Sequence, residues 1–365
     1  MRSFYRFFLG LHRWLLVNLA VLAAFFLLRG QRAIANLLCF RAAMPFERAV
    51  GSLCARLPFS VGELLYAAAG VAAVLFILLS IRAVWRAEYR REVLYRRFMI
   101  LLNTALSVYA AFCLLWGVNY YADGFCDRAG LRRDAVSVEE LTRVTAYFAQ
   151  QLTDSAWDVP RDADDAFAAA RDEILAYAPS LYDETMYEEF PFLRLSPDPV
   201  PKKMLFSRLM SEMNFTGFYC PFTGECNVNT DFPADQLAAT AAHELAHRRG
   251  IASEQECNFI AVLAASRSEN PLYRYSGWMM GYIHLSNALY SVDADAWRAI
   301  RAALPDPVLA DLYRSNQYWS RFEGLTAEVS THAYDAMLRS NGQSLGMRSY
   351  GAVVDLLVSY YGERI

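Results

Sequence analysis

Three long apolar stretches occupy the first third of the chain, at residues 7–28, 61–81 and 98–120. Each has close to the ~20 consecutive apolar residues that a helix needs to cross a bilayer. The rest of the chain mixes apolar and polar positions, as soluble domains do. We therefore expect a membrane domain with three transmembrane helices in residues 1–121 and a second domain in residues 122–365.

The first apolar stretch has one property of a secretory signal peptide, because Arg2 and Arg6 precede it. However, Arg29, Gln31 and Arg32 follow it, and no small-residue cleavage site stands at its end. Two more apolar stretches of similar length come after it. The pattern therefore favours a retained transmembrane helix over a cleaved signal peptide.

The second part of the chain shows the pattern of a mainly α fold. Ser137 and Glu140 form a capping box, which predicts a helix from there to about residue 152. An alanine-rich run predicts another helix at residues 162–177. Beyond Pro233 the pattern is helical to the C-terminus.

Residues 215–230 interrupt the helical pattern. Gly217, Pro221 and Gly224 stand among aromatic residues there, which predicts a short strand or hairpin. The end of this segment, residues 225–229, is either an edge strand that pairs with an extended peptide or part of a plain structural hairpin.

Charge separates the two parts of the chain. Residues 1–121 carry a formal net charge of +10, and residues 122–365 carry −13. Nucleic acid attracts strongly basic surfaces, so the acidic balance of the second part argues against it as a partner.

The arginines predict the side of the membrane on which the larger domain lies. The positive-inside rule places arginine-rich loops in the cytoplasm. The loop between the second and third stretches holds Arg82, Arg86, Arg90, Arg91, Arg96 and Arg97. Arg2, Arg6 and Arg13, near the N-terminus, are expected on the same side of the membrane. That side then has nine arginines, against five in the loop after the first stretch. We therefore expect a multi-pass protein of the cell membrane whose larger domain is extracytoplasmic.

The clearest chemical signal is the HExxH sequence at residues 243–247. Zinc needs neutral imidazole nitrogens that converge on one point, and His243 and His247, at positions i and i+4, project from the same face of a helix. Glu244 can reach a water beside the metal without binding the metal, which suits a general base. Gly250 stands where a helix C-cap is expected.

A catalytic zinc site also needs a third protein ligand. Glu254 and Glu256 both follow the predicted metal helix, at the start of a second helix. They lie about 200° apart around a helix with ~100° per residue, so both cannot face one metal ion. We favour Glu254 as the ligand. Asn258, one turn later, can orient a ligand histidine through a hydrogen bond.

Other kinds of zinc site fit the segment less well. The metzincin pattern requires its third ligand at position 253, where the chain has Ser253, a poor zinc ligand. Intramembrane site-2 proteases need a metal helix that spans lipid, but Asp231, Asp235, Arg248 and Arg249 flank this one. Seven cysteines without a CxxC pair argue against a thiolate zinc site.

Two of the cysteines, Cys220 and Cys226, flank a turn-rich segment. They form a disulfide if this side of the membrane is oxidising, and otherwise they are small buried thiols. The sequence leaves both alternatives open.

Five blocks of sequence carry a resemblance that covers most of the chain. They are LPFSVGELLY at 57–66, WGVNY at 116–120, GFYCPFTGE at 217–225, the metal segment at 243–259, and SNGQ with SYG at 340–343 and 349–351. On these blocks the chain resembles a bacterial family of uncharacterised integral membrane proteins with an HExxH zinc-peptidase centre, catalogued as a domain of unknown function.

The metal segment also looks like that of gluzincin peptidases, whose third ligand is the first Glu of a Glu-x-x-Ala-Asp pattern. This resemblance implies Glu254 as the ligand, with Cys257 in place of the alanine and Asn258 in place of the aspartate. Cys226 also stands where the resemblance implies alanine, so a Cys226 to Cys257 disulfide is a second candidate pairing. The implied fold is zincin-like and predominantly helical.

These features together predict a membrane-anchored zinc metalloendopeptidase, a gluzincin-like hydrolase that acts on a peptide or protein substrate. We expect Zn²⁺ on His243, His247 and Glu254. A zinc-activated water would attack the peptide bond, with Glu244 as the general base. His284, His332 and Tyr334 are weaker candidates for stabilising the oxyanion, because each is more often a structural residue.

An inactive zinc-binding protein that acts as a membrane sensor or scaffold is the alternative. A sensor usually has a signalling module in the cytoplasm, and the arginine-rich loop of ~16 residues is too short for one. A purely structural zinc usually has four protein ligands, and the sequence identifies three. The plainest alternative is a structural helix with two unrelated histidines.

Overall fold

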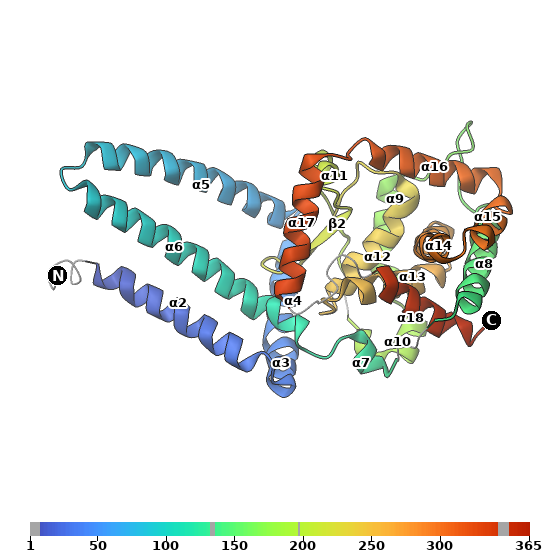
Figure 1. Ribbon diagram of the computed structural model, residues 1–365, viewed down its shortest axis with the longest axis horizontal. Coiled ribbons are helices and arrows are strands. Elements are labelled where there is room, and N and C mark those ends of the chain that lie inside the picture. The colour runs from blue at the N-terminus through green and yellow to red at the C-terminus, as the bar shows by residue number, and fades with distance from the viewer. Residues whose placement is uncertain (1–7, 132–135, 196–197, 342–349) are drawn as a thin grey trace.

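The structure is a computed structural model that describes residues 8–131, 136–195, 198–341 and 350–365. It is mainly helical, and three long helices project from one side of a globular part that contains the remaining elements (Figure 1). The fold class predicted from the sequence is therefore confirmed at the level of a mainly α protein with a small sheet.

The three projecting helices are α2 (Leu9–Leu28), α5 (Val61–Arg86) and α6 (Arg90–Leu115), and each is long and apolar enough to cross a membrane. The first two begin within two residues of their predicted starts. The third begins earlier than predicted, because most of the arginine-rich loop is helical and only residues 87–89 separate α5 from α6. The side of the membrane on which the globular part lies stays a prediction.

A helical segment joins α2 to α5 at the base of the projecting helices. It contains α3 (Arg32–Leu38), a short π-helical turn (Cys39–Ala43) and α4 (Met44–Cys54). Side chains from α2, α6 and this segment form a small apolar core of their own. It includes Leu22, Phe25, Ala35, Cys39, Met44, Ala110 and Cys113.

One small sheet lies in the described part of the chain. Its strands are β1 (Lys202–Lys203), β2 (Gly217–Cys220) and β3 (Glu225–Val228), in the order β1-β3-β2, with β2 antiparallel to β3. The predicted hairpin is thus present. Of the two alternatives for residues 225–229, the structure has the structural hairpin and not the edge strand, because β3 lies between β1 and β2 in the described sheet.

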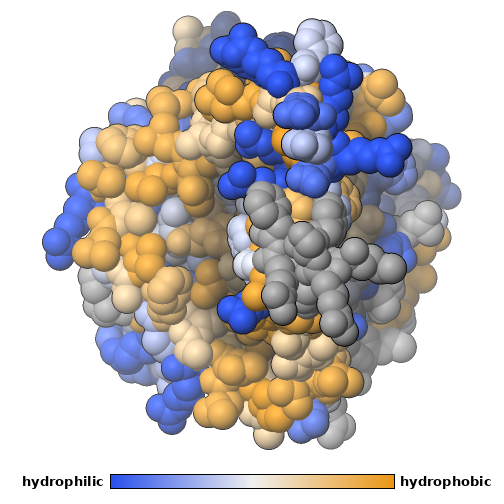
Figure 2. Space-filling model, turned by 90° about the vertical axis from the view of Figure 1, so that its left-hand side faces the viewer, coloured by the Kyte–Doolittle hydropathy of each residue, from blue (hydrophilic) through white to orange (hydrophobic). Residues whose placement is uncertain are grey.

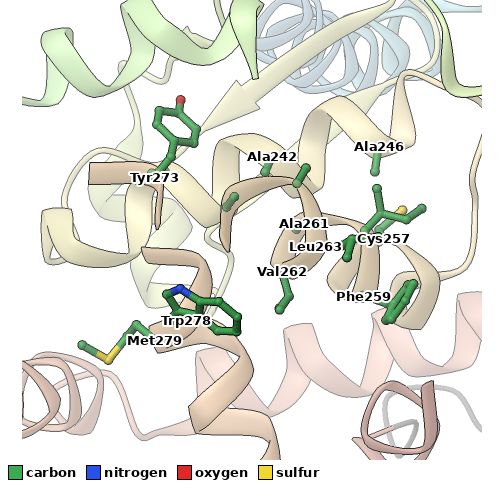
Figure 3. Close-up of a cluster of buried hydrophobic side chains, with 14 of the residues drawn as sticks. Ala242, Ala246, Cys257, Phe259, Ala261, Val262, Leu263, Tyr273, Trp278 and Met279 are labelled. Carbon is green, nitrogen blue, oxygen red and sulfur yellow. The ribbon is translucent and has the colours of Figure 1, made fainter. Parts of the chain in front are cut away.

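The main core surrounds three consecutive helices, α12 (Leu237–His247), α13 (Glu254–Ser266) and α14 (Pro271–Val292). Alanines on α12 and α13 allow the helices to approach closely, and larger side chains from α13 and α14 fill the remaining space. Figure 3 shows Ala246 of α12 near Cys257 of α13, with Trp278 of α14 below.

Further helices cover this core. The capping box of Ser137 and Glu140 opens α8 (Val138–Ser155), which confirms the helix predicted there. The others are α7 (Phe125–Ala129), α9 (Arg171–Tyr177), α10 (Glu184–Glu189), α11 (Ser207–Glu212), α15 (Ala294–Ala302), α16 (Asp306–Ser320), α17 (Leu325–Ser340) and α18 (Tyr350–Gly362). Part of the C-terminal resemblance block falls on residues 342–349, outside the described residues.

The helix predicted at residues 162–177 is wrong over its first half, since α9 begins only at Arg171. The side chain of Asp162 accepts hydrogen bonds from the backbone N–H groups of Asp164, at 2.9 Å, and Ala166, at 2.8 Å. Such local bonds compete with a helical backbone and favour a turn.

Candidate metal centre

Helix α12 brings the two histidines of the HExxH sequence together. His243 and His247 are one turn apart, and their ring centroids lie 4.7 Å from each other. The helix ends at His247, and Gly250 reverses the chain with a φ of 80°, a conformation that favours glycine. This reversal lets α13 begin beside the end of α12.

The first residue of α13, Glu254, faces both imidazoles. Its carboxylate oxygens lie 3.1 Å from His243 Nε2 and 3.6 Å from His247 Nε2. The Nε2 atoms of the two histidines lie 3.1 Å apart. Among the described residues, these three side chains form the group that could hold a metal ion.

Glu256, the other glutamate that the sequence offered as a ligand, points elsewhere. Its carboxylate accepts hydrogen bonds from the backbone N–H groups of Phe125, at 2.9 Å, and Cys126, at 3.0 Å. It therefore binds the N-terminus of α7, where a negative charge is favourable.

Hydrogen bonds on the far side of each ring orient the two imidazoles. His243 donates from Nδ1 to the side-chain oxygen of Asn258, at 2.8 Å. His247 donates from Nδ1 to the backbone carbonyl of Ile251, also at 2.8 Å. Because Nδ1 carries the proton in each neutral ring, both Nε2 atoms present lone pairs toward each other and toward Glu254.

This donor set fits a zinc ion. Two imidazole Nε2 atoms and a carboxylate lie this close together when a proton or a metal ion lies between them. In a tetrahedral site with bonds of ~2.0–2.1 Å, ligand atoms lie about 3.3–3.4 Å apart. The observed separations of 3.1, 3.1 and 3.6 Å bracket that value. Two histidines and a glutamate are also a donor set typical of catalytic zinc.

Glu244 lies beside this group and is buried. Burial raises its pKa to about 7, although the neighbouring histidines favour the ionised form. A carboxyl group with such a pKa can both accept and release a proton near neutral pH. Its Oε1 atom lies against Gly217 at the start of β2, where a Cβ atom would come within 2.5 Å of it.

The three weaker candidates for the oxyanion lie in different environments. The hydroxyl of Tyr334, on α17, donates a hydrogen bond to Glu254. His284, on α14, lines the same cleft as the metal ligands, and burial lowers its pKa to about 4, so its ring is neutral. His332 is exposed and does not line the cleft.

The metal group lies in a cleft of about 590 Å³. Its walls include the β2 edge and side chains from α14 and α17. Residues at the ends of two candidate transmembrane helices also contribute, namely Tyr66 of α5 and Phe112 of α6. The ring of Trp116, the residue after α6, meets the His247 ring edge to face with centroids 5.6 Å apart.

Sequence reasoning missed the cleft residues contributed by other parts of the chain. Trp116 and Tyr120 stand at the end of the third predicted transmembrane stretch, and Gly217 stands in the predicted strand or hairpin. The available signal was that these residues belong to blocks that carry the family resemblance.

Neither predicted disulfide is present, since Cys220, Cys226 and Cys257 are all free thiols. The thiol of Cys226 donates to the backbone carbonyl of Glu244, and that of Cys257 to the carbonyl of Ile251. Both thiols therefore pack against backbone that positions the metal group.

Comparison with known proteins identifies a family. Residues 44–358 match a family described as a protein of unknown function, DUF3810. The chain belongs to the DUF3810 family. The DUF3810 match includes α5 and α6 as well as the complete metal group, so the membrane helices and the site belong to one family unit. No curated protein and no solved structure matches the chain.

Proposed function

We propose that this DUF3810 protein is a membrane-anchored zinc metallopeptidase with a zincin-like catalytic domain. The observation that carries the proposal is the convergence of two imidazole lone pairs and the Glu254 carboxylate, with buried Glu244 beside them in one cleft. A zinc ion with a purely structural role does not need a further buried carboxyl group beside its ligands, such as that of Glu244.

His243, His247 and Glu254 would hold the zinc ion. When bound, zinc supplies a Lewis acid that polarises a peptide carbonyl and makes water more acidic. Glu244, buried beside these ligands, would take the proton from the attacking water and pass it to the leaving amine. Tyr334 holds a hydroxyl at the Glu254 carboxylate and is the best placed of the three candidates to stabilise the oxyanion.

The β2 edge offers a place for an extended substrate. Thr216, Gly217, Phe218 and Tyr219 line the cleft, and β2 has β3 on one side only in the described sheet. A peptide that added a strand at this edge would pass directly over Glu244.

The first test measures zinc and cleavage together. When the protein is purified in detergent, we expect about one zinc ion per chain, because His243, His247 and Glu254 supply three ligands for one ion. His243→Ala should lose this zinc, and the matched control His332→Ala, which changes an exposed histidine outside the cleft, should keep it. Elemental analysis of the two variants measures the difference.

Glu244→Gln separates metal binding from catalysis. The variant should keep its zinc and lose cleavage of a mixed-sequence peptide library by about 10²–10⁴-fold, the usual contribution of a general base. Turnover at the wild-type rate in this variant would remove the mechanism. Zinc in the wild type without cleavage of any peptide would favour an inactive sensor or scaffold instead.

A further inference from the structure

We propose that the substrate is a polypeptide with its own membrane anchor, and that the bond cleaved lies within about six residues of that anchor. This inference rests on the proposed function and names its substrate class. It follows from the contacts that the ends of the candidate transmembrane helices make with the candidate metal centre and with the hairpin beside it.

Helix α6 leads directly into the site. It ends at Leu115, and the next residue, Trp116, packs against the metal ligand His247. The Trp116 indole also donates a hydrogen bond to the hydroxyl of Tyr120, which lines the cleft. No spacer therefore separates the end of this candidate span from the metal group.

Helix α5 begins at the other end of the substrate edge. The carboxylate of Glu225, in β3, accepts hydrogen bonds from the first backbone N–H groups of α5, at 3.1 Å from Val61 and 2.8 Å from Gly62. Gly62 lies against Cys220, the last residue of β2, where a Cβ atom would be 3.1 Å from the Cys220 side chain. The hairpin is thus fixed to the start of α5.

The length of strand β2 sets the distance between Glu244 and the start of α5, where we expect the bilayer to begin. Its first residue, Gly217, contacts Glu244, and its last residue, Cys220, contacts the start of α5. A strand rises ~3.3 Å per residue, so the three steps between them cover about 10 Å. A substrate strand alongside β2 would reach the first turn of α5 within three or four residues, and two more allow for the interface.

Apolar side chains continue from α5 onto the globular part. Glu63, in the first turn of α5, accepts hydrogen bonds from the backbone N–H groups of Leu205, at 2.9 Å, and Phe206, at 2.6 Å. This contact places residues 205–209 beside the start of α5, and residues 53–59 precede α5 in the chain. Their large exposed apolar residues, which we call the interfacial patch, are Leu53, Leu57, Phe59, Leu205, Phe206 and Leu209.

The interfacial patch fits a lipid surface. Leu205 is 72% exposed and Leu53 is 61% exposed. Exposure of such apolar side chains to water is unfavourable, and contact with the bilayer interface would remove them from water. Figure 2 looks along the projecting helices toward the globular part, and apolar side chains cover much of the face in view. The globular part therefore rests on the membrane, and the cleft wall formed by Tyr66 and Phe112 meets it.

A pair of substrates tests the inference. The first is a peptide library of twenty variable residues joined to a 20-residue leucine and alanine transmembrane helix, at either its N-terminal or its C-terminal end. The second is the same library without the helix. Both are incubated with the full-length protein in phosphatidylcholine vesicles. We expect kcat/KM to be at least about tenfold higher for the anchored library, because the anchor raises the local concentration of substrate.

The cut positions give a second readout. Mass spectrometry should find cuts in the anchored library clustered within about six residues of the helix end, as the length of β2 requires. Equal cleavage of both libraries, or cuts spread evenly over the twenty residues, would overturn the inference and leave the peptidase intact. Failure to cleave either library would count against the proposed function itself.

Binding supplies a readout that needs no turnover. Glu244→Gln in vesicles should bind the anchored library at least about tenfold more tightly than the free one, measured by photo-crosslinking yield. Tyr66→Ala, which removes a cleft wall on α5 that packs on Phe218 with centroids 5.9 Å apart, should lower the anchored-to-free ratio. Tyr89→Ala, at the far end of α5 and 66% exposed, is the matched control and should keep the ratio. An unchanged ratio in Tyr66→Ala with normal zinc content would contradict the proposed route.

Discussion

Asn258 is one of two residues that depart from the gluzincin pattern, in which an aspartate stands at this place. An amide oxygen accepts the His243 Nδ1–H at 2.8 Å but carries no charge. It therefore fixes the orientation of the ring without raising the basicity of Nε2 as strongly as a carboxylate does.

Asn258→Ala should weaken zinc binding by about 10–100-fold, because His243 would lose the hydrogen bond that selects its tautomer and orientation. Competition with a fluorescent zinc chelator measures the affinity. Asn316→Ala, which changes an exposed asparagine on α16, is the control and should leave the affinity unchanged. A change below about twofold in Asn258→Ala would show that packing alone orients the ring.

The sequence predicted the residues of the site that lie close together along the chain. His243, Glu244 and His247 follow from helix periodicity. The angle between helix positions shows that Glu254 and Glu256 cannot both face the metal, and the gluzincin resemblance implies Glu254. Tyr334 donates to Glu254 from 80 positions away, and its place depends on how α17 packs. Sequence spacing holds no information about such a contact, so Tyr334 stood level with His284 and His332.

At the level of elements, the close approach of β2 to α12 positions Glu244, the proposed general base. Gly217 allows the strand to lie directly against Glu244, and β2 is in turn held by its pairing with β3. The hairpin was predictable from its turn residues. Which of its strands formed the edge was not, because the two-residue strand β1 pairs with β3 and carries no recognisable strand pattern.

Gly217→Ala tests this positioning role. A Cβ atom there would lie 2.5 Å from Glu244 Oε1 and 2.9 Å from the Asn227 carbonyl, so the glutamate must move. We expect kcat to fall on the order of 100-fold while zinc content stays unchanged, since misplacing a catalytic group by ~1 Å has an effect of that size. Gly70→Ala, where an added Cβ meets no atom within 4 Å, is the control. Normal kcat in Gly217→Ala would show that β2 does not position Glu244.

For the whole molecule, the predicted division into residues 1–121 and 122–365 stays a prediction, but important contacts cross it. The Tyr219 hydroxyl, in β2, donates to the buried carboxylate of Glu47 in α4 at 3.1 Å. Burial raises the pKa of Glu47 to about 8, so the protonation state of this carboxyl group depends on the residues packed around it. Trp116 also packs against the His247 ring in an edge-to-face contact.

A fragment of residues 122–365 should therefore bind zinc at least about tenfold more weakly than the full chain and melt at a lower temperature, because it lacks Trp116, α4 and α5. A chain without residues 1–28 keeps these contacts and should retain its zinc. Calorimetry and elemental analysis compare the three proteins. Equal zinc affinity of the 122–365 fragment and the full chain would show that the membrane part contributes nothing to the site.

The bond between Glu225 and the first turn of α5 has a consequence for biosynthesis. Until α5 has formed and taken its place in the lipid, the Glu225 carboxylate lacks the partners that compensate its burial, and the hairpin that holds Glu244 is unfavourable. A chain in which α5 cannot fold or insert is therefore expected to lose the hairpin that holds Glu244.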